Sequence, residues 1–230
     1  MVKLTQSKET YDRIFAEGGY QGLYDLPYWH SAYYPLFKAV LAGVLKHGGK
    51  AVLEVGCGTG AFADLLMDRS SLAYRGFDFS EVAVEKARAR TGRQRCFFVG
   101  DATLKSSYEG QTYDCIVCTE VLEHIDNDLE AIAHWKPGIF CACSVPNFDA
   151  ETHVRFFKSE DEVKHRYGNL IDIESVVRIK KPVQSNISLA NILREMSWNR
   201  YRPSQLMAIM GLGSFESLGG WFLFSGTRRA

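Results

Sequence analysis

Between residues 50 and 147, short apolar segments alternate with segments of helical periodicity, and this alternation constrains the fold more than any other feature. Strands are expected at 50–56, 72–80, 96–102, 113–119 and 139–147, and helices over 61–70, 81–91 and 128–134. A helix that joins neighbouring parallel strands crosses over in a right-handed sense. The pattern therefore predicts an α/β fold with a Rossmann-like, doubly wound, mostly parallel sheet and helices on both faces.

The flanking segments are expected to complete one domain that spans residues 1–230. Residues 1–49 are rich in aromatic side chains and predict an N-terminal helical lid over the site. Residues 148–219 are expected to form an irregular capping insert before the last strand. Residues 220–230 contain the apolar run GWFLFSG and predict a strand that closes the sheet.

Composition narrows the choice of partners. The 230 residues are 46% hydrophobic and carry a formal net charge of zero. No apolar run is long enough to span a bilayer and no secretory leader is visible, so we expect a cytoplasmic location and no membrane partner. A neutral chain lacks the basic surface that neutralises phosphates, so nucleic acid is not expected as a partner. We expect a monomer or a homodimer.

The six cysteines are predicted to be buried and reduced. Cys115 and Cys118 form a C-x-x-C pattern inside an expected strand, where residues three apart point to opposite faces. Their sulfur atoms therefore cannot bind one zinc ion. Cys141 and Cys143 share a face of their strand but have no second pair to complete a metal site.

The residues that follow the strands carry the chemistry, because ligands of open α/β sheets bind beyond the carboxyl ends of the strands. The first strand ends in EVGCGTG, a glycine turn that lets the backbone approach a ligand closely. The second places Asp78 where a carboxylate can accept from both ribose hydroxyls of an adenosine, and the third ends near Asp101. NAD-dependent oxidoreductases share the glycines and the ribose acid, so that class stays open here.

Taken together, VLEVGCGTG, the acids after the second and third strands, and EVLEH after the fourth resemble the class I S-adenosylmethionine-dependent methyltransferases. The resemblance covers residues 50–147, the expected cofactor-binding core, and within the superfamily points to the small-molecule branch that includes the ubiquinone-biosynthesis O-methyltransferases. It implies S-adenosylmethionine as cofactor, S-adenosylhomocysteine as product, and methyl transfer to an oxygen or nitrogen of a small molecule. The implied cofactor contacts are Glu54, Gly56, Cys57, Gly58 and Gly60 at the methionine part, Asp78 at the ribose, Phe79, Asp101 and Ala102 at the adenine, and Thr119, Glu120 and Val121 near the sulfonium.

The segment TEVLEHI supports two interpretations. Positions three and four apart on a helical turn share a face, so Glu120, Glu123 and His124 are expected to converge. In the branch named above, this segment commonly forms a wall of the pocket without a metal. The small-RNA terminal 2′-O-methyltransferases use the same E-x-x-E-H with one more histidine to bind a divalent cation, and His153 lies in about the right place. Because the chain is neutral and offers no evident platform for single-stranded RNA, we expect no metal and keep the metal-assisted RNA enzyme as the alternative.

A hydroxyl acceptor needs a base, and imidazole titrates near neutral pH, so His153 and His124 are the candidate catalytic residues, with His30 as a third base. Candidate acceptor-binding residues are Tyr24, Tyr28, Trp29, His30, Tyr33, Asn147 and Arg200. Residues 176–230 carry eight Lys or Arg against two acids, for a net charge of +6. Because Arg194, Arg200 and Arg202 lie there, an acidic or phosphate-bearing acceptor is one expectation. A regulatory domain that binds the cofactor without turnover is a further alternative.

Overall fold

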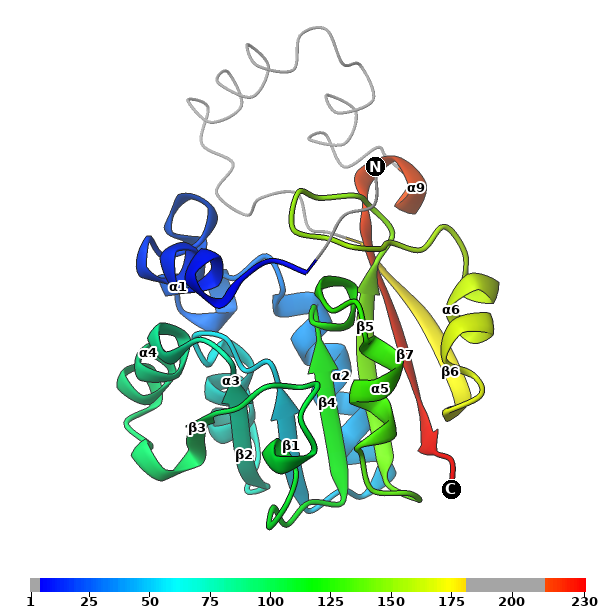
Figure 1. The fold of residues 1–230 in the computed structure, drawn as a ribbon, viewed down its shortest axis with the longest axis horizontal. Helices are drawn as coiled ribbons and strands as arrows, with labels where there is room; N and C mark the ends of the chain where they lie inside the picture. Colours follow the sequence, from blue (N-terminus) through cyan, green and yellow to red (C-terminus); the bar gives the residue numbers. More distant parts are fainter. Residues whose placement is uncertain (1–4, 181–213) are drawn as a thin grey trace, which may run out of the picture.

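The computed structural model describes residues 5–180 and 214–230 and shows one seven-stranded sheet in the order β3-β2-β1-β4-β5-β7-β6 (Figure 1). The strands are β1 (Ala51–Val55), β2 (Ala73–Asp78), β3 (Phe97–Val99), β4 (Cys115–Thr119), β5 (Phe140–Pro146), β6 (Ile171–Lys180) and β7 (Gly220–Arg228). Strands β1 to β5 run parallel, whereas β7 runs antiparallel to both β5 and β6. The predicted Rossmann-like, mostly parallel α/β fold is confirmed.

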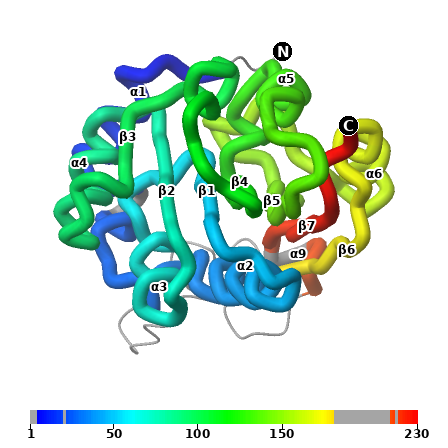
Figure 2. The backbone as a smooth tube through the Cα atoms, turned by 90° about the horizontal axis from the view of Figure 1, so that it is seen from below, coloured from blue at the N-terminus to red at the C-terminus, as the bar shows by residue number. Residues whose placement is uncertain are grey.

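Helices cover both faces of the sheet (Figure 2). The α-helices are α1 (Lys8–Ala16), α2 (Tyr34–His47), α3 (Ala61–Arg69), α4 (Glu81–Thr91), α5 (Asp128–Ala133), α6 (Glu160–Tyr167) and α9 (Phe215–Leu218), and the 3-10 turns are η1 (Tyr20–Asp25), η2 (Tyr28–His30), η3 (Gln94–Cys96), η4 (Lys105–Ser107) and η5 (Leu122–His124). Helices α2, α3 and α4 share one hydrophobic core that includes Val40 and Phe62. Helices α5 and α6 share a second core, which includes Ile132 and Tyr167. Within residues 5–180 and 214–230, no helix has the length and apolarity needed to cross a membrane.

The cysteines lie as the strand geometry predicts. Cys115 belongs to the core beneath α2, whereas Cys118 belongs to the core on the opposite face. All six cysteines are free thiols. Burial raises the pKa of Cys115 to about 12, and desolvation of the same kind raises that of Cys118 well above its ordinary value. These cysteines are therefore neutral core residues at physiological pH.

The helix predicted over 81–91 has these bounds in the structure, because the Ser80 hydroxyl caps its first turn and Gly92, at φ 66°, ends it. The prediction of irregular structure over the whole insert before the last strand is wrong, because α6 and β6 form there. Strand β6 lies at the edge of the sheet, and most of its side chains are half-buried or exposed. Its polar sequence, IDIESVVRIK, therefore lacks the apolar run by which the other strands were predicted. Helix α2 covers the sheet, so the N-terminal lid is limited to the residues before it.

A buried charge network holds the loops that follow β4 and β5. Asp128 is fully buried at the start of α5, and its two carboxylate oxygens accept from Arg166 at 2.8 and 2.6 Å and from the Tyr167 hydroxyl at 2.9 Å. Arg155 Nη1 lies 3.2 Å from Asp128, and the same guanidinium donates to the Asp126 carbonyl at 2.9 Å. The network therefore links α5 and α6 to the segment that carries η5.

Removing the charge of Asp128 is expected to destabilise the protein far more than removing the charge of an exposed aspartate. Asp128→Asn leaves the half-buried Arg155 and Arg166 and the buried Tyr167 hydroxyl without their carboxylate, so we expect a loss of about 3 kcal/mol in the free energy of unfolding. Asp172 pairs with Arg229 at 2.6 Å but its side chain is 68% exposed, so Asp172→Asn is expected to cost under about 0.5 kcal/mol. Urea unfolding of both variants checks this, and equal losses would contradict it.

Candidate active site

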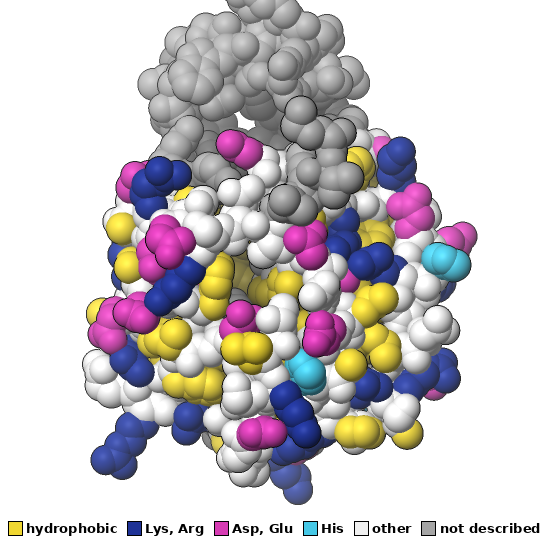
Figure 3. All heavy atoms as spheres, viewed as in Figure 1, with side chains coloured by type: hydrophobic (Ala, Val, Ile, Leu, Met, Phe, Trp, Pro, Cys, Tyr) yellow, Lys and Arg dark blue, Asp and Glu magenta, His cyan; other side chains and the backbone are white. Residues whose placement is uncertain are grey.

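A cavity of about 910 Å³ opens beyond the carboxyl ends of β1, β2 and β4. Figure 3 shows this face hollowed near its centre, with hydrophobic side chains in the hollow and carboxylates beside it. Ligand pockets usually measure about 300–1,000 Å³, so this cavity is large enough for a nucleoside-sized ligand with a small second molecule. Its position matches the rule for open α/β sheets.

All but one of the sequence-predicted cofactor residues line this cavity. They are Glu54, Gly56, Cys57, Gly58, Asp78, Phe79, Asp101, Ala102, Thr119, Glu120 and Val121. Gly60 is the exception. Gly60 caps the start of α3 at φ 79°. A Cβ added there would lie 2.9 Å from the Ala87 Cβ of α4, so a glycine is needed for α3 to pack this closely against α4.

Asp78 ties the glycine turn to the end of β2. Its Oδ2 accepts from the Gly58 N–H and its Oδ1 from the Ser80 N–H, both at 3.0 Å. Burial nevertheless raises the pKa of Asp78 to about 6, since desolvation outweighs these two bonds. Gly56 has φ 70°, and a Cβ there would lie 2.2 Å from Val121 Cγ2. The turn after β1 and the segment after β4 therefore pack directly against each other.

Glu54 is a buried carboxyl group at the base of the cavity. It is 2% exposed, and the Tyr74 hydroxyl donates to its Oε2. Burial raises the pKa of Glu54 to about 8, and the charge of Asp78 adds to this effect against the hydrogen bond from Tyr74. Glu54 therefore retains its proton at neutral pH.

Glu120 holds an unusual backbone conformation at the end of β4. Its φ of 58° is the one positive value among the non-glycine residues that the structure describes. The Ser144 hydroxyl donates to Glu120 Oε1 at 3.1 Å, and the Trp221 indole N–H donates to Oε2 at 2.6 Å. The side chain is thus held from β5 and β7, the two strands next to β4 on that side of the sheet.

Glu123, His124 and His153 form a compact cluster at the edge of the cavity, with one potential ligand atom from each within 4.8 Å of the others. Glu120, the fourth residue of the predicted set, is not among these three, and its carboxylate accepts from Ser144 and Trp221 while its charge acts on Glu123. Glu123 is fully buried, and neither of its carboxylate oxygens has a hydrogen-bond donor among the described residues.

Both imidazoles of the cluster place Nδ1 against a backbone carbonyl oxygen. His124 Nδ1 lies 2.9 Å from the Thr152 carbonyl oxygen, and His153 Nδ1 lies 3.2 Å from that of Phe148. Because a carbonyl only accepts, both Nδ1 atoms are assigned the proton, and each Nε2 then presents a lone pair. Burial lowers the pKa of His124 to about 4 and raises that of Glu123 well above its ordinary value, with the Glu120 charge as a second cause for Glu123.

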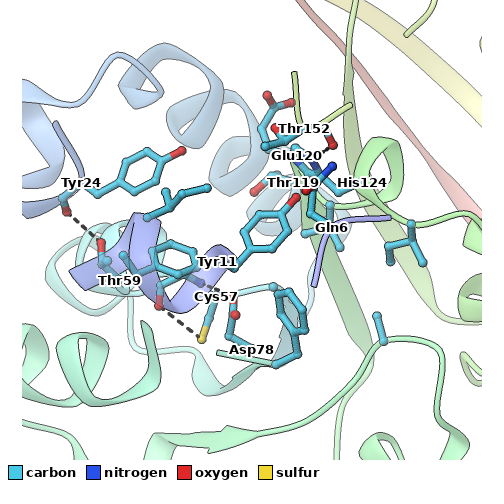
Figure 4. A pocket seen from close by; sticks show the side chains of 18 of the residues that line it. Gln6, Tyr11, Tyr24, Cys57, Thr59, Asp78, Thr119, Glu120, His124 and Thr152 are labelled. Carbon is cyan, nitrogen blue, oxygen red and sulfur yellow. Dashed lines mark hydrogen bonds between the residues drawn. The ribbon is translucent and has the colours of Figure 1, made fainter. Parts of the chain in front are cut away.

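Helix α1 lies across the mouth of the cavity, and none of its residues is fully buried. Its Tyr11 ring makes edge-on contacts with Phe79, at 5.1 Å between centroids, and with His124, at 5.7 Å. In Figure 4, Tyr11 lies between Asp78 and His124. Sequence analysis placed the lid aromatics after residue 20 and missed Tyr11. The signal was present in Ser7, which caps α1 through its hydroxyl.

The acceptor candidates of the N-terminal region divide into two groups. Tyr24 and Tyr33 line the cavity, and Figure 4 shows Tyr24 at one end of it. Tyr28 does not line the cavity, because it is buried beside α3 and its hydroxyl donates to Asp68 at 2.5 Å. Trp29 is 54% exposed and His30 is also exposed, so both lie outside the cavity in the described residues.

Asn147 does not line the cavity either. The Asn147 amide donates to the Phe215 carbonyl at 3.1 Å and its oxygen accepts from the Gly220 N–H at 2.7 Å, so it fixes the start of β7. Arg200 lies outside the described residues, as do Arg194 and Arg202. Phe148 and Thr152, which precede His153, line the cavity.

Comparison with known proteins supports what the geometry indicates. A family described as a methyltransferase domain matches residues 28–181, more than half of the chain. The ubiquinone biosynthesis O-methyltransferase of Vibrio cholerae serotype O1 is 33% identical over 97 residues. That alignment covers 39% of this chain and 39% of the relative, so the chain matches well under half of the length of this curated relative.

Solved structures share the fold over nearly the whole chain. The [4+2]-cyclase SpnF superposes with a TM-score of 0.65 at 18% identity and 100% coverage of both chains. The N-methyltransferase NodS from Bradyrhizobium japonicum WM9, in complex with S-adenosylhomocysteine, gives a TM-score of 0.60 at 18% identity over 95% of this chain and 97% of that one. The family match, the strand order and the ring of strand-end residues lead to one conclusion: the chain belongs to the class I S-adenosylmethionine-dependent methyltransferases.

Proposed function

We propose that this protein transfers the methyl group of S-adenosylmethionine to an oxygen or nitrogen of a small molecule. The observation that carries the proposal is the cavity at the carboxyl edge of the sheet, which the strand-end residues line together. Phe79 and Asp101 line the part that follows β2 and β3, and Gly56 and Gly58 line the part that follows β1. This order fits a cofactor extended from adenine to methionine, with its sulfonium toward Glu120.

The proposed methyl transfer requires few contributions from the protein. The sulfur–methyl bond breaks as the oxygen–methyl or nitrogen–methyl bond forms, and the electron pair remains on S-adenosylhomocysteine. The protein has to align the three centres, exclude water and accept one proton. For a hydroxyl acceptor we assign the proton to His153 or His124, because both line the cavity and present Nε2 as the accepting atom.

The charge of the acceptor is the open part of the proposal. Among the described residues that line the cavity, Lys8 is the one lysine or arginine, and it pairs with Glu81 at 2.8 Å. The described wall therefore favours a neutral or cationic acceptor. An acidic or phosphate-bearing acceptor would have to be recognised by Arg194, Arg200 or Arg202, which lie outside the described residues.

The cluster of Glu123, His124 and His153 fits a divalent cation. It collects a buried carboxylate without a donor and two imidazoles whose Nδ1 atoms are held by backbone carbonyls, as is usual for metal-binding histidines. These three residues would hold the ion. When bound, such a cation lowers the pKa of a coordinated hydroxyl. We retain this as the alternative to a histidine base, with a small molecule as the acceptor, because an Nε2 atom that coordinates the ion cannot also accept the proton.

The first test is ligand-dependent thermal stability. S-adenosylmethionine and S-adenosylhomocysteine are expected to stabilise the protein, by about 2.7 kcal/mol at a hundredfold excess over the dissociation constant, and NAD is expected to have no effect. Asp78→Asn should weaken both ligands at least about tenfold, since the ribose loses a charged acceptor. Asp114→Asn is the matched control, because Asp114 also accepts from backbone N–H groups but lies at the opposite edge of the sheet. Stabilisation by NAD alone would refute the proposal.

Cofactor affinity is expected to depend on pH through Glu54. Glu54 holds its proton up to about pH 8, and the ammonium group of a bound cofactor favours the ionised form. Binding below pH 8 therefore releases a proton and strengthens as the pH rises, by at most about tenfold per pH unit, with no further gain above pH 8. The affinity ratio of wild type to Glu54→Gln, measured by calorimetry from pH 6 to 9, isolates this effect. A ratio independent of pH contradicts it.

The metal site has its own test. Manganese alone is expected to raise the melting temperature of the wild type and to give a bound-ion signal in electron paramagnetic resonance. Glu123→Gln and His153→Ala should each lose that shift, since both remove a ligand atom. His134→Ala is the control, because its imidazole contacts the Thr103 carbonyl at 3.0 Å, outside the cluster. If manganese neither shifts the melting temperature nor binds, the cation is excluded and the histidines remain candidate bases only.

A further inference from the structure

Arg90, near the end of α4, joins two segments of the cavity wall that are far apart in the sequence. Its guanidinium donates to three backbone carbonyl oxygens: Nη2 to Tyr24 at 2.6 Å, Nη1 to Leu26 at 2.7 Å and Nε to Thr59 at 2.8 Å. Tyr24 and Leu26 lie in the lid between α1 and α2, whereas Thr59 belongs to the glycine turn between β1 and α3. These three residues line the cavity and Arg90 does not, so Arg90 acts on the wall from behind it.

The Thr59 hydroxyl completes a closed ring of hydrogen bonds. It donates to the same Tyr24 carbonyl oxygen at 2.8 Å, and Figure 4 shows this contact at one end of the cavity. The Tyr24 carbonyl therefore accepts from both Thr59 and Arg90, and the Thr59 carbonyl accepts from Arg90. Thr59 is 6% exposed, so little water reaches these bonds. Bonds from a charged donor are also stronger than neutral ones, so the ring holds the two segments together firmly.

A second contact between α4 and the lid is weaker. Lys86 pairs with Asp25 at 2.9 Å, but the Asp25 side chain is 53% exposed, and exposed ion pairs contribute little to stability. Arg90 differs in geometry as well as in burial. Its planar guanidinium directs several donors along fixed, diverging directions, which a lysine ammonium on a flexible stem does not reproduce. Arg90 therefore determines where the backbone of Tyr24 lies relative to Thr59.

The Tyr24 ring has little freedom once its backbone is fixed. Gly19 has φ 73°, and a Cβ there would lie 2.4 Å from Tyr24 Cδ2, so the ring lies directly against the Gly19 backbone. The Phe15 ring lies 5.8 Å from it between centroids. Burial raises the pKa of Tyr33 well above its ordinary value, and its neighbour Tyr24 adds to this effect. The position of Tyr24 thus affects both tyrosines that line the cavity.

We propose that Arg90 is a positioning residue, which together with Thr59 holds Tyr24 at the acceptor end of the cavity in a fixed position relative to the glycine turn. The inference rests on the proposed function, because it takes that turn as part of the cofactor site. A cofactor that orders the turn then also orders Tyr24 through the ring of hydrogen bonds. The acceptor wall is therefore in place when the cofactor is bound, and methyl transfer depends steeply on such alignment.

Amide hydrogen exchange tests this with S-adenosylhomocysteine and without any acceptor. The Gly58 N–H donates to Asp78 at 3.0 Å and reports on the turn, while the Tyr24 N–H donates to the Gly18 carbonyl at 2.9 Å and reports on the lid. Saturating S-adenosylhomocysteine is expected to slow exchange at both amides of the wild type, at Tyr24 by at least about fivefold. In Arg90→Lys the slowing at Gly58 should persist, whereas that at Tyr24 should fall below about twofold.

Two further variants separate positioning from a general effect on stability. Thr59→Val removes the hydroxyl that donates to Tyr24 and should also reduce the slowing at Tyr24, whereas Thr59→Ser keeps that donor and should retain it. Arg88→Lys is the matched control, because Arg88 is also half-buried on α4 but donates to the Phe97 carbonyl at 2.8 Å, away from the lid. Thr59→Val replaces Arg90→Lys if the latter fails to fold.

The outcomes distinguish the proposed function from the role of Arg90. If S-adenosylhomocysteine neither binds the wild type nor slows exchange at Gly58, the proposed function fails. If it does both, but Tyr24 does not respond in the wild type, or responds equally in Arg90→Lys, the proposed function stands and the positioning role is overturned. An equal loss of the response in Arg88→Lys also overturns that role.

Discussion

Parallel strands bring their carboxyl ends to one edge of the sheet, and in this protein that edge withdraws several carboxyl groups from water. The low dielectric disfavours their charged forms, so each needs a partner or a proton. Glu54 keeps its proton and accepts from Tyr74, while Asp78 accepts from two backbone N–H groups. Glu120 takes donors from Ser144 and Trp221. Carboxyl groups gathered at this edge favour the binding of a positively charged ligand, and S-adenosylmethionine carries both a sulfonium and an ammonium group.

The succession of strands and helices along the chain and the residues at the strand ends were accessible from the sequence, because both depend on local patterns. Asp78 follows an apolar run and precedes a capped helix, so its place at the edge needs no long-range information. Trp221 was not accessible in this way. It meets Glu120 only because β7 inserts antiparallel between β5 and β6 and places Trp221 opposite Pro146. No spacing in the sequence indicates a contact between residues 101 positions apart.

Two of the predicted acceptor residues, Tyr28 and Asn147, do not line the cavity, and the physical reason is the same for both. Aromatic and amide side chains suit both ligand binding and internal packing, and the sequence does not show which neighbours are available. Tyr28 finds Asp68 on α3, and Asn147 finds the backbone of residues 215 and 220. Both contacts satisfy polar groups within the fold, where they hold elements in place. Tyr24 and Tyr33, from the same aromatic stretch as Tyr28, line the cavity instead.

The way α1 is attached agrees with a cavity that must admit a ligand as large as S-adenosylmethionine. The helix contributes no fully buried residue, and its polar anchors are Lys8 to Glu81 at 2.8 Å and the Asp12 carboxylate to the Ser80 hydroxyl at 2.5 Å. Exposed ion pairs contribute at most about 1 kcal/mol each, far less than the burial of a core helix. Displacing α1 therefore breaks one exposed ion pair, the hydrogen bond from the buried Ser80 hydroxyl to Asp12 and the Tyr11 contacts with the pocket rings, while both cores of the sheet remain intact. A lid attached in this way opens at a small fraction of the free energy that unfolding the sheet requires.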